Sequence, residues 1–302
     1  MRSMLFVPGN RPELLAKAVA SGADAIIFDL EDAVPEASKR LARENLATLE
    51  PLPVPLYVRV NGGETDHLWE DVAAAGASGA AGIVLPKAEE PSLLQRIEGA
   101  LTVLELSGRG SRGGIEIVPL IESARGVMTT YEMCRSTPRV RSVLFGSGEE
   151  GDLVADLGCQ WTPEGTGLLA ARAAVLMAAR AAGVQEPMEA VYMDFKNLDG
   201  LRTECELARR LGYVGKVAIH PQQVAVINDV FTPSAEEVAK HQRIVDAFEE
   251  AVAHGSASIS VDGRMVDYAV ARVSRSVLAR AAPMRAPDPD AGNGASTSAS
   301  KE

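Results

Sequence analysis

The feature that most constrains the fold of this chain is a repeated alternation of short apolar runs with amphipathic stretches. The runs are rich in Val, Ile and Leu, and each is followed by glycine, proline or charged residues and then by a helical pattern. Parallel strands that are buried on both faces have this kind of sequence. We find eight such runs, at residues 3–7, 25–29, 56–60, 82–87, 114–122, 140–145, 190–194 and 217–221.

Eight strand–helix repeats predict an α/β fold, a (β/α)8 or TIM barrel, over residues 1–230. A doubly wound open sheet is the alternative, but no glycine-rich dinucleotide fingerprint follows the first run. Beyond the barrel, residues 231–282 predict a C-terminal helical extension, with a hairpin or loop at 256–262. The stretch 283–302 is rich in Pro, Gly, Ala and Ser, so we expect it to be disordered.

Composition excludes several classes of partner. The 302 residues, 46% of them hydrophobic, suffice for one large core, and the net charge of -11 argues against nucleic-acid and anionic-membrane partners. No apolar run approaches membrane-spanning length, and Met1 leads directly into a strand pattern without a secretory signal. Three widely spaced cysteines predict neither a disulfide framework nor a zinc site. A reducing cytoplasm is the expected location.

Acidic residues follow two neighbouring strands. Glu122 ends the run 114–122, and Asp152 closes the glycine-rich segment after the next run. Side chains at the carboxyl ends of barrel strands face the active-site mouth. Oxygen ligands without thiols suit Mg²⁺ or Mn²⁺, so these two residues are the predicted metal ligands. The alternatives are a carboxylate at a helix N-terminus for Glu122 and a loop or helix-cap aspartate for Asp152.

Arg59 lies inside an apolar strand pattern and cannot be buried without a partner. It either pairs with a barrel carboxylate or holds a substrate carboxylate by its fork, or does each in turn. Asp29, Glu31 and Asp32 follow the adjacent strand, so they could pair with it or bind metal-held water. His220 stands at the exit of the eighth run, and as a lone histidine it is more often structural than a base.

The chain resembles the citrate lyase β-subunit-like family, which includes malyl-CoA and citramalyl-CoA lyases. The resemblance rests on motifs that follow the family's order from residue 2 to about residue 280. The motifs are Arg2-Ser3 with Leu5 to Asn10, Asp29 to Val34, Val58 to Asn61, Leu85-Pro86-Lys87, Pro119 to Ala124, Asp152 to Gly158, Ile219-His220-Pro221 and Phe231 to Ser234.

The resemblance implies a Mg²⁺-dependent carbon–carbon lyase that cleaves or forms a β-hydroxyacyl-CoA, releasing acetyl-CoA and a 2-keto acid. By motif, Glu122 and Asp152 match metal ligands and Arg59 matches the residue that grips the keto acid. Asp267 matches the acid/base that protonates the acetyl enolate, supplied across the interface of a homotrimer or hexamer. The matching substrate-binding positions are Phe6, Lys17, Glu31, Asp32, Ile219 and His220.

Two departures from the family pattern affect these assignments. The segment from Phe145 to Asp152 is about three residues longer than the family's usual Phe-Gly-x-x-Asp run, so Glu149 or Glu150 is an alternative second ligand. The family's frequent Tyr-Ala-Arg is replaced by Ala170-Ala171-Arg172. The citrate lyase β-subunit tends to lack the C-terminal part, so its presence here favours a stand-alone CoA-ester lyase.

The sequence is also compatible with three other functions. One is a metal-dependent aldolase that acts on free hydroxy-keto acids without CoA. Another is an accessory subunit of the citrate lyase β type, which acts on an acyl-carrier thioester within a larger complex. The third is a degenerate barrel without catalysis. The sequence does not identify the acyl group, because one methyl group changes binding by only about 1–3 kcal/mol.

Overall fold

The computed structural model describes residues 1–108 and 113–281. The stretch 283–302, for which the sequence predicts disorder, lies outside the described residues. Contacts divide the chain into two compact units, Met1–Asp229 and Val230–Glu302.

Unit 1 is a closed barrel of eight parallel strands in sequential order, and the fold prediction is confirmed. The last strand pairs with the first, with Met4 opposite Val217, which closes the sheet. The strands are β1 (Ser3–Pro8), β2 (Ala25–Asp29), β3 (Leu56–Arg59), β4 (Gly82–Leu85), β5 (Glu116–Ile121), β6 (Ser142–Phe145), β7 (Glu186–Glu189) and β8 (Gly215–Ala218).

The position predicted for the seventh strand is wrong. The sequence favours residues 190–194, whereas β7 is Glu186–Glu189, which pairs with β6 and β8. The segment Glu-Pro-Met-Glu is not an apolar run, so the sequence pattern does not mark it as a buried strand. Its Glu189 is fully buried nevertheless, because two buried cations neutralise the carboxylate. Lys216 donates to it at 2.8 Å, and Arg172 donates to its other oxygen.

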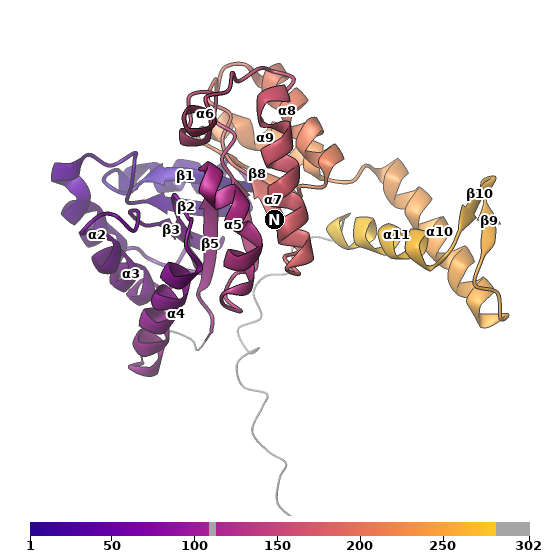
Figure 1. Ribbon diagram of the computed structural model, residues 1–302, viewed down its shortest axis with the longest axis horizontal. Helices are drawn as coiled ribbons and strands as arrows, with labels where there is room; N and C mark the ends of the chain where they lie inside the picture. Colours follow the sequence, from indigo (N-terminus) through magenta and orange to yellow (C-terminus); the bar gives the residue numbers. More distant parts are fainter. Residues whose placement is uncertain (109–112, 282–302) are drawn as a thin grey trace, which may run out of the picture. The chain divides into compact units, whose positions relative to one another are not determined.

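Helices follow the strands around the barrel, and α2, α3, α4, α5 and α7 lie around the strands in Figure 1. None of the helices in the described part of the chain is both long and apolar enough to cross a membrane. The helices of unit 1 are α1 (Leu15–Ala20), α2 (Lys39–Ala47), α3 (Leu68–Ala77), α4 (Pro91–Leu106), α5 (Ala124–Arg135), α6 (Asp152–Leu157), α7 (Leu169–Ala181), α8 (Leu198–Leu211) and α9 (Pro221–Phe231), which crosses the boundary between the units.

Side chains from every strand fill the barrel interior. The interior residues are small or aliphatic, with one tyrosine, and they alternate with residues that face the helices, as expected for a barrel of this size. This cluster contains Met4, Ala25, Ile27, Tyr57, Val84, Val118, Leu120, Leu144, Met188, Ala190 and Val217. Because the interior is packed, functional side chains can gather only at the strand ends.

The described residues of unit 2 after α9 form α10 (Ala235–Ala253), a hairpin of β9 (Ile259–Val261) and β10 (Arg264–Val266), and α11 (Tyr268–Ala281). Ser234 caps α10 through a capping box with Glu237, which sets the start of this helix at Ala235. The last described helix begins at Tyr268. Residues 264–266 form the second strand of the hairpin, with Asp262 and Gly263 at positive φ in its turn.

Candidate active site

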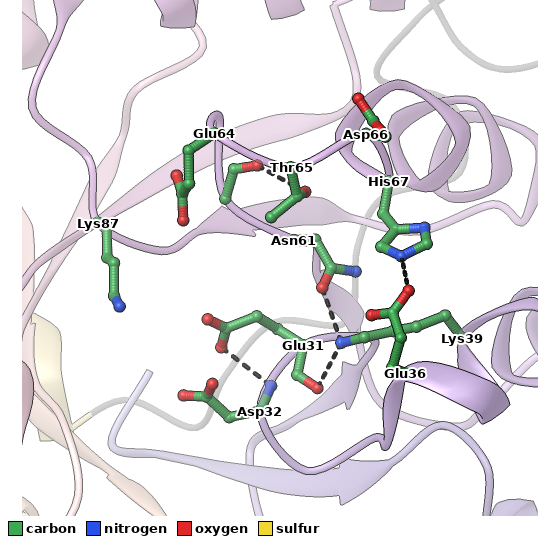
Figure 2. A pocket seen from close by; sticks show the side chains of 11 residues that line it. Glu31, Asp32, Glu36, Lys39, Asn61, Glu64, Thr65, Asp66, His67 and Lys87 are labelled. Carbon is green, nitrogen blue, oxygen red and sulfur yellow. Dashed lines mark hydrogen bonds and ion pairs between the residues drawn. The ribbon is translucent and has the colours of Figure 1, made fainter.

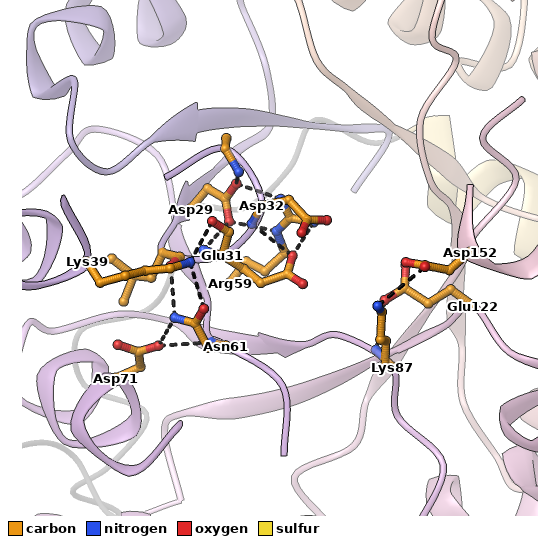
Figure 3. Close-up of polar contacts among 12 residues, drawn as sticks. Asp29, Glu31, Asp32, Lys39, Arg59, Asn61, Asp71, Lys87, Glu122 and Asp152 are labelled. Atoms are coloured by element: carbon orange, nitrogen blue, oxygen red, sulfur yellow. Dashed lines mark hydrogen bonds and ion pairs between the residues drawn. The ribbon is translucent and has the colours of Figure 1, made fainter. Parts of the chain in front are cut away.

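Two groups of polar residues lie at the carboxyl ends of the barrel strands (Figure 3). One is centred on Arg59 at the end of β3, and the other comprises Lys87, Glu122 and Asp152, after β4, β5 and β6. A cavity of about 250 Å³ is bordered by both groups, and its walls include Phe6, Arg59, Glu122 and Asp152. Glycines and apolar residues supply the remaining walls, namely Leu120, Gly146, Gly148, Gly151, Leu153, Ala190, Val191 and Met193, together with Asp32 and Glu150.

Glu122 follows β5 directly and is fixed by a backbone group. Its Oε1 accepts a hydrogen bond from the backbone N–H of Lys87 at 2.8 Å. Burial raises the pKa of Glu122 to about 7, although the Lys87 amide and the Arg59 charge favour the ionised form. A carboxyl group with a pKa near neutrality, in a cavity wall, is typical of a functional site.

Asp152 is the first residue of the short helix α6, which the eight strand–helix repeats of the sequence do not include. The helix was missed because a glycine-rich segment precedes it and it has only six residues. The Asp152 side chain is 49% exposed, and its Oδ1 lies 3.3 Å from Lys87 Nζ. Glu122 and Asp152 therefore bind the same residue, one through its amide and the other through its ammonium group.

The alternative ligands differ in position. Glu150 lines the cavity, whereas Glu149 does not, and both are exposed in the turn before α6. That turn is closed by a hydrogen bond from Gly151 N to Gly148 O at 3.0 Å. This tight turn lies directly before Asp152 in the chain, with Glu150 at the cavity wall.

The fork of Arg59 is occupied by a buried carboxylate. Its Nε and Nη2 donate to the two oxygens of Asp29 at 2.7 and 2.6 Å. Nη1 lies 2.9 Å from Glu31 Oε2, and the ring of Phe6 lies 4.6 Å from the guanidinium carbon. Burial lowers the pKa of Arg59, but attraction to Asp29 and Glu31 outweighs it and raises the pKa overall. Only the Nη1 edge therefore remains for a substrate oxygen.

Glu31 and Asp32 differ in their burial. The Glu31 side chain is 13% exposed, and burial raises its pKa to about 7. The Asp32 side chain is 73% exposed and lies 3.7 Å from Arg59 Nη1. A ligand carboxylate could replace Glu31 on Arg59 at a smaller electrostatic cost than it could replace Asp29, which is fully buried and accepts four hydrogen bonds.

A buried lysine holds the loop that carries Glu31. Lys39 Nζ donates to the carbonyls of Leu30 and Glu31 at 2.8 and 2.9 Å and to Asn61 Oδ1 at 2.7 Å. Asn61 in turn donates its backbone N–H to Asp71 at 2.9 Å. Sequence reasoning gave no role to Lys39, because nothing in an amphipathic helix pattern distinguishes a buried lysine from an exposed one.

Four predicted site residues do not line the described cavities. Lys17 is exposed on α1. Ile219 N and His220 N donate to Gln223 Oε1, and the His220 ring stacks on Phe195 at 4.9 Å. Asp267 belongs to unit 2, where its Oδ1 accepts from Val270 N at 3.0 Å and so caps α11. Lys87 contacts both predicted ligands, but the sequence marked it only by its place at the end of the run 82–87 and in the motif Leu85-Pro86-Lys87.

The donor set fits a hard divalent cation. Glu122 and Asp152 supply oxygen atoms only, and both already interact with one positively charged residue. In the described residues there is no group of three or more His, Cys, Asp or Glu that could hold a metal ion. Two carboxylates suit Mg²⁺, which commonly takes one or two protein carboxylates and fills its other positions with water and substrate.

The structure is a (β/α)8 barrel with acidic residues at its mouth, and comparison with known proteins gives its family. The model described as HpcH/HpaI aldolase/citrate lyase matches residues 2–221, and a model described as a C-C bond lyase of the TIM-barrel fold matches residues 173–282. The chain belongs to the HpcH/HpaI aldolase/citrate lyase family and is a carbon–carbon lyase.

Similar proteins carry two kinds of name. The citrate lyase subunit beta of Leuconostoc mesenteroides subsp. cremoris is 35% identical over 92% of each chain. A (3S)-malyl-CoA thioesterase of Cereibacter sphaeroides is 36% identical, over 93% of this chain and 94% of the other. CitE from Mycobacterium tuberculosis, in complex with magnesium, acetoacetate and coenzyme A, is 30% identical with a TM-score of 0.74, covering 93% and 97% of the two chains.

One inference drawn from the resemblance is wrong for these relatives. We expected the citrate lyase β-subunit to lack the C-terminal part. The Leuconostoc relative leaves only 8% of this chain unmatched, which is far less than unit 2, so its match extends into that unit. The presence of unit 2 therefore does not separate a stand-alone CoA-ester lyase from a citrate lyase β-subunit.

Proposed function

We propose that this protein is a Mg²⁺-dependent lyase that cleaves or forms a β-hydroxyacyl-CoA such as malyl-CoA or citramalyl-CoA. The products of cleavage are acetyl-CoA and a 2-keto acid. The proposal is carried by one observation: Glu122, after β5, and Asp152, after β6, both contact Lys87 and line one cavity with the Arg59 guanidinium. It is supported by the CitE structure, which contains magnesium, a keto acid and coenzyme A.

Glu122 and Asp152 would hold Mg²⁺, with Mn²⁺ as a substitute and with Glu150 as the alternative second ligand. When bound, the cation polarises the β-hydroxyl and the acid oxygens of the substrate. Arg59 orients the keto acid through its Nη1 edge while Asp29 fixes its other edge. The Phe6 ring packs against the guanidinium and so helps to hold it in place.

Asp267 would act as the acid/base of the reaction. In cleavage, the β-hydroxyl loses its proton to water and its oxygen becomes the carbonyl of the keto acid. At the same time the bond between the α- and β-carbons of the acyl chain breaks, and its electron pair passes to the acetyl thioester as an enolate. The Asp267 carboxyl protonates that enolate, and in condensation the carboxylate removes the same proton from acetyl-CoA. We place Asp267 in the site of a neighbouring subunit of a homotrimer or hexamer, with residues 231–282 as the contributing extension.

The remaining predicted residues would contact the CoA ester. Glu31 and Asp32 lie at the Arg59 end of the cavity, where they could direct the acid part of the substrate. Lys17, Ile219 and His220 lie outside the described cavity, so we assign them to the more distant CoA portion. A cytoplasmic location accompanies this proposal, since coenzyme A esters are intracellular substrates.

The test is a product analysis with and without divalent cation. We expect malyl-CoA or citramalyl-CoA to yield acetyl-CoA and the keto acid, and we expect EDTA to abolish the reaction until Mg²⁺ is restored. Full activity in the chelated protein would contradict the proposal. An equal mixture of Asp267→Asn and Glu122→Gln, each inactive alone, should recover activity if the site is shared between subunits. No recovery would remove Asp267 from the neighbour's site.

Hydrolysis of the thioester is a second candidate, favoured by the relatives named (3S)-malyl-CoA thioesterase. The same product analysis separates the two activities, because hydrolysis yields free CoA and the intact hydroxy acid, with no keto acid. The citrate lyase β-subunit function predicts cleavage of an acyl-carrier thioester in preference to a CoA ester. Cleavage of free hydroxy-keto acids, insensitive to added CoA, would instead indicate an aldolase.

A further inference from the structure

The ammonium group of Lys87 lies at the proposed cation site, and the proposed function gives it no role. Lys87 Nζ is 3.3 Å from Asp152 Oδ1, and the Lys87 backbone N–H donates to Glu122 at 2.8 Å. The two carboxylates assigned to a divalent cation therefore already have a positively charged partner within the same chain. An ammonium ion and a divalent cation cannot both occupy this position, because their charges repel.

The backbone of Lys87 is held in an unusual conformation. Its φ is +46°, and Asp262 is the only other non-glycine residue with a positive φ in the described part of the chain. Such a conformation persists where the surrounding structure imposes it, often at a functional site. Here it directs the N–H to Glu122, while Ala88 N donates to Leu120 O at 3.2 Å. Glu122 therefore keeps this hydrogen bond whichever side chain is present at position 87.

The Lys87 side chain also borders a second, polar cavity of about 570 Å³, which Figure 2 shows. Glu31, Asp32 and Glu64 contribute carboxylates to this cavity. Glu64 is exposed, and no hydrogen bond or ion pair joins its carboxylate to another described residue. The Lys87 side chain is 43% exposed, so a change of rotamer can move its ammonium group from one cavity toward the other.

We propose that the Lys87 ammonium group is an internal counter-ion of the cation site, which a divalent cation displaces from Asp152 and which then turns into the polar cavity toward Glu64. The inference rests on the proposed function, since it takes Glu122 and Asp152 as the metal ligands. Lys87 then affects how tightly the metal binds, although the proposed reaction uses no contact between Lys87 and the substrate. The displaced ammonium group exchanges one carboxylate partner for another, so the charge stays compensated.

The experiment is a titration of the substrate-free protein with Mn²⁺, in which electron paramagnetic resonance measures the concentration of free Mn²⁺. Lys87→Gln should bind Mn²⁺ roughly five- to tenfold more tightly than the natural protein, because the cation no longer competes with an ammonium group. Lys87→Arg keeps the charge and should bind no more tightly. Arg40→Gln is the matched control: it removes one positive charge from an arginine that is 83% exposed on α2 and should leave the affinity unchanged.

A double-mutant cycle tests the second position of the ammonium group. Glu64→Gln should weaken Mn²⁺ binding about two- to threefold when Lys87 is present, since the displaced lysine then loses its partner. In the Lys87→Gln background the same change should have no effect. Equal effects of Glu64→Gln in both backgrounds would overturn the movement toward Glu64.

Glu122→Gln separates failure of this inference from failure of the proposed function. If Glu122→Gln abolishes Mn²⁺ binding but Lys87→Gln binds no more tightly than the natural protein, the counter-ion role is overturned and the metal site stands. If Mn²⁺ binding does not depend on Glu122 or Asp152, the proposed function and this inference both fail. Tighter binding by Lys87→Gln that still requires Glu122 supports both.

Discussion

Replacement of Asp29 by asparagine tests whether the buried Asp29–Arg59 pair supports both the fold and the site. Asp29 is fully buried, and its two oxygens accept from Arg59 Nε, Arg59 Nη2, Glu31 N and Ala33 N at 2.6–3.1 Å. In Asp29→Asn one oxygen becomes an NH₂ group, which cannot accept. Each oxygen accepts two of the four hydrogen bonds, so two N–H donors then lack their acceptor, and the guanidinium loses its buried counter-charge.

The expected loss in the free energy of unfolding is about 3–5 kcal/mol, the usual cost of removing one partner of a buried ion pair. At 2–4 °C per kcal/mol for a domain of this size, the melting temperature should fall by roughly 6–20 °C. Glu31, at 2.9 Å from Nη1, still compensates part of the Arg59 charge, so we expect a loss in the lower half of the range of free energies. Arg59 should also lose its fixed orientation, which raises KM for the keto acid in condensation.

Tryptophan fluorescence during urea unfolding is a suitable assay. Both tryptophans, Trp69 and Trp161, lie in unit 1, so the signal follows the barrel. Asp32→Asn is the matched control, because it removes the same charge near Arg59 from a side chain that is 73% exposed and 3.7 Å away. It should cost less than about 1 kcal/mol. If the Asp29 and Asp32 variants lose equal stability, the reasoning from burial is refuted.

Three further predictions concern the site and the buried charges. Lys216→Met should lower the free energy of unfolding by about 3–5 kcal/mol in urea, because the buried Glu189 loses its 2.8 Å partner, and a loss below 1 kcal/mol would contradict this. Mn²⁺ affinity should rise between pH 6 and 8, since the cation needs ionised Glu122, whose pKa is raised from 4.5 to about 7. Because of the same raised pKa, the metal-free folded protein binds more protons than the unfolded chain between pH 4.5 and 7. Its stability should therefore fall as the pH rises from 4.5 to 7. A flat pH profile of the Mn²⁺ affinity or of the stability would argue against the raised pKa. Gly146→Ala should weaken Mn²⁺ binding about tenfold, because the new Cβ would lie 2.8 Å from Glu122 Cβ, whereas Gly148→Ala, with its nearest neighbour at 3.7 Å, should not, and equal affinities would show that Glu122 tolerates the contact.

The sequence was sufficient for the architecture because the barrel depends on a local repeat. Each apolar run with its following helix is a pattern within about thirty residues, and seven of the eight predicted runs overlap strands of the closed sheet. The same rule placed Arg59, Glu122 and Asp152 at one end of the barrel, where the structure has them around one cavity. The roles of these residues stay proposals.

The sequence could not show which charges are buried or which partners they have. The strand Glu186–Glu189 was missed because its carboxylate is neutralised by Arg172 and Lys216, which come from 17 residues before Glu189 and 27 residues after it. Lys39 and Lys87 have the same side chain, yet one is buried against loop carbonyls and the other reaches Asp152. Such contacts are made between residues distant in sequence, so no local pattern contains them.

By itself, then, the order of residues determined the number of strands, the closed barrel and the end at which chemistry gathers, because hydrophobic periodicity and the direction of parallel strands fix these. Only the tertiary structure decided that Asp29 occupies the fork of Arg59 and that the backbone of Lys87 directs its N–H to Glu122. Both depend on distances of about 3 Å between separate strand ends, and such distances are set by how the whole barrel packs.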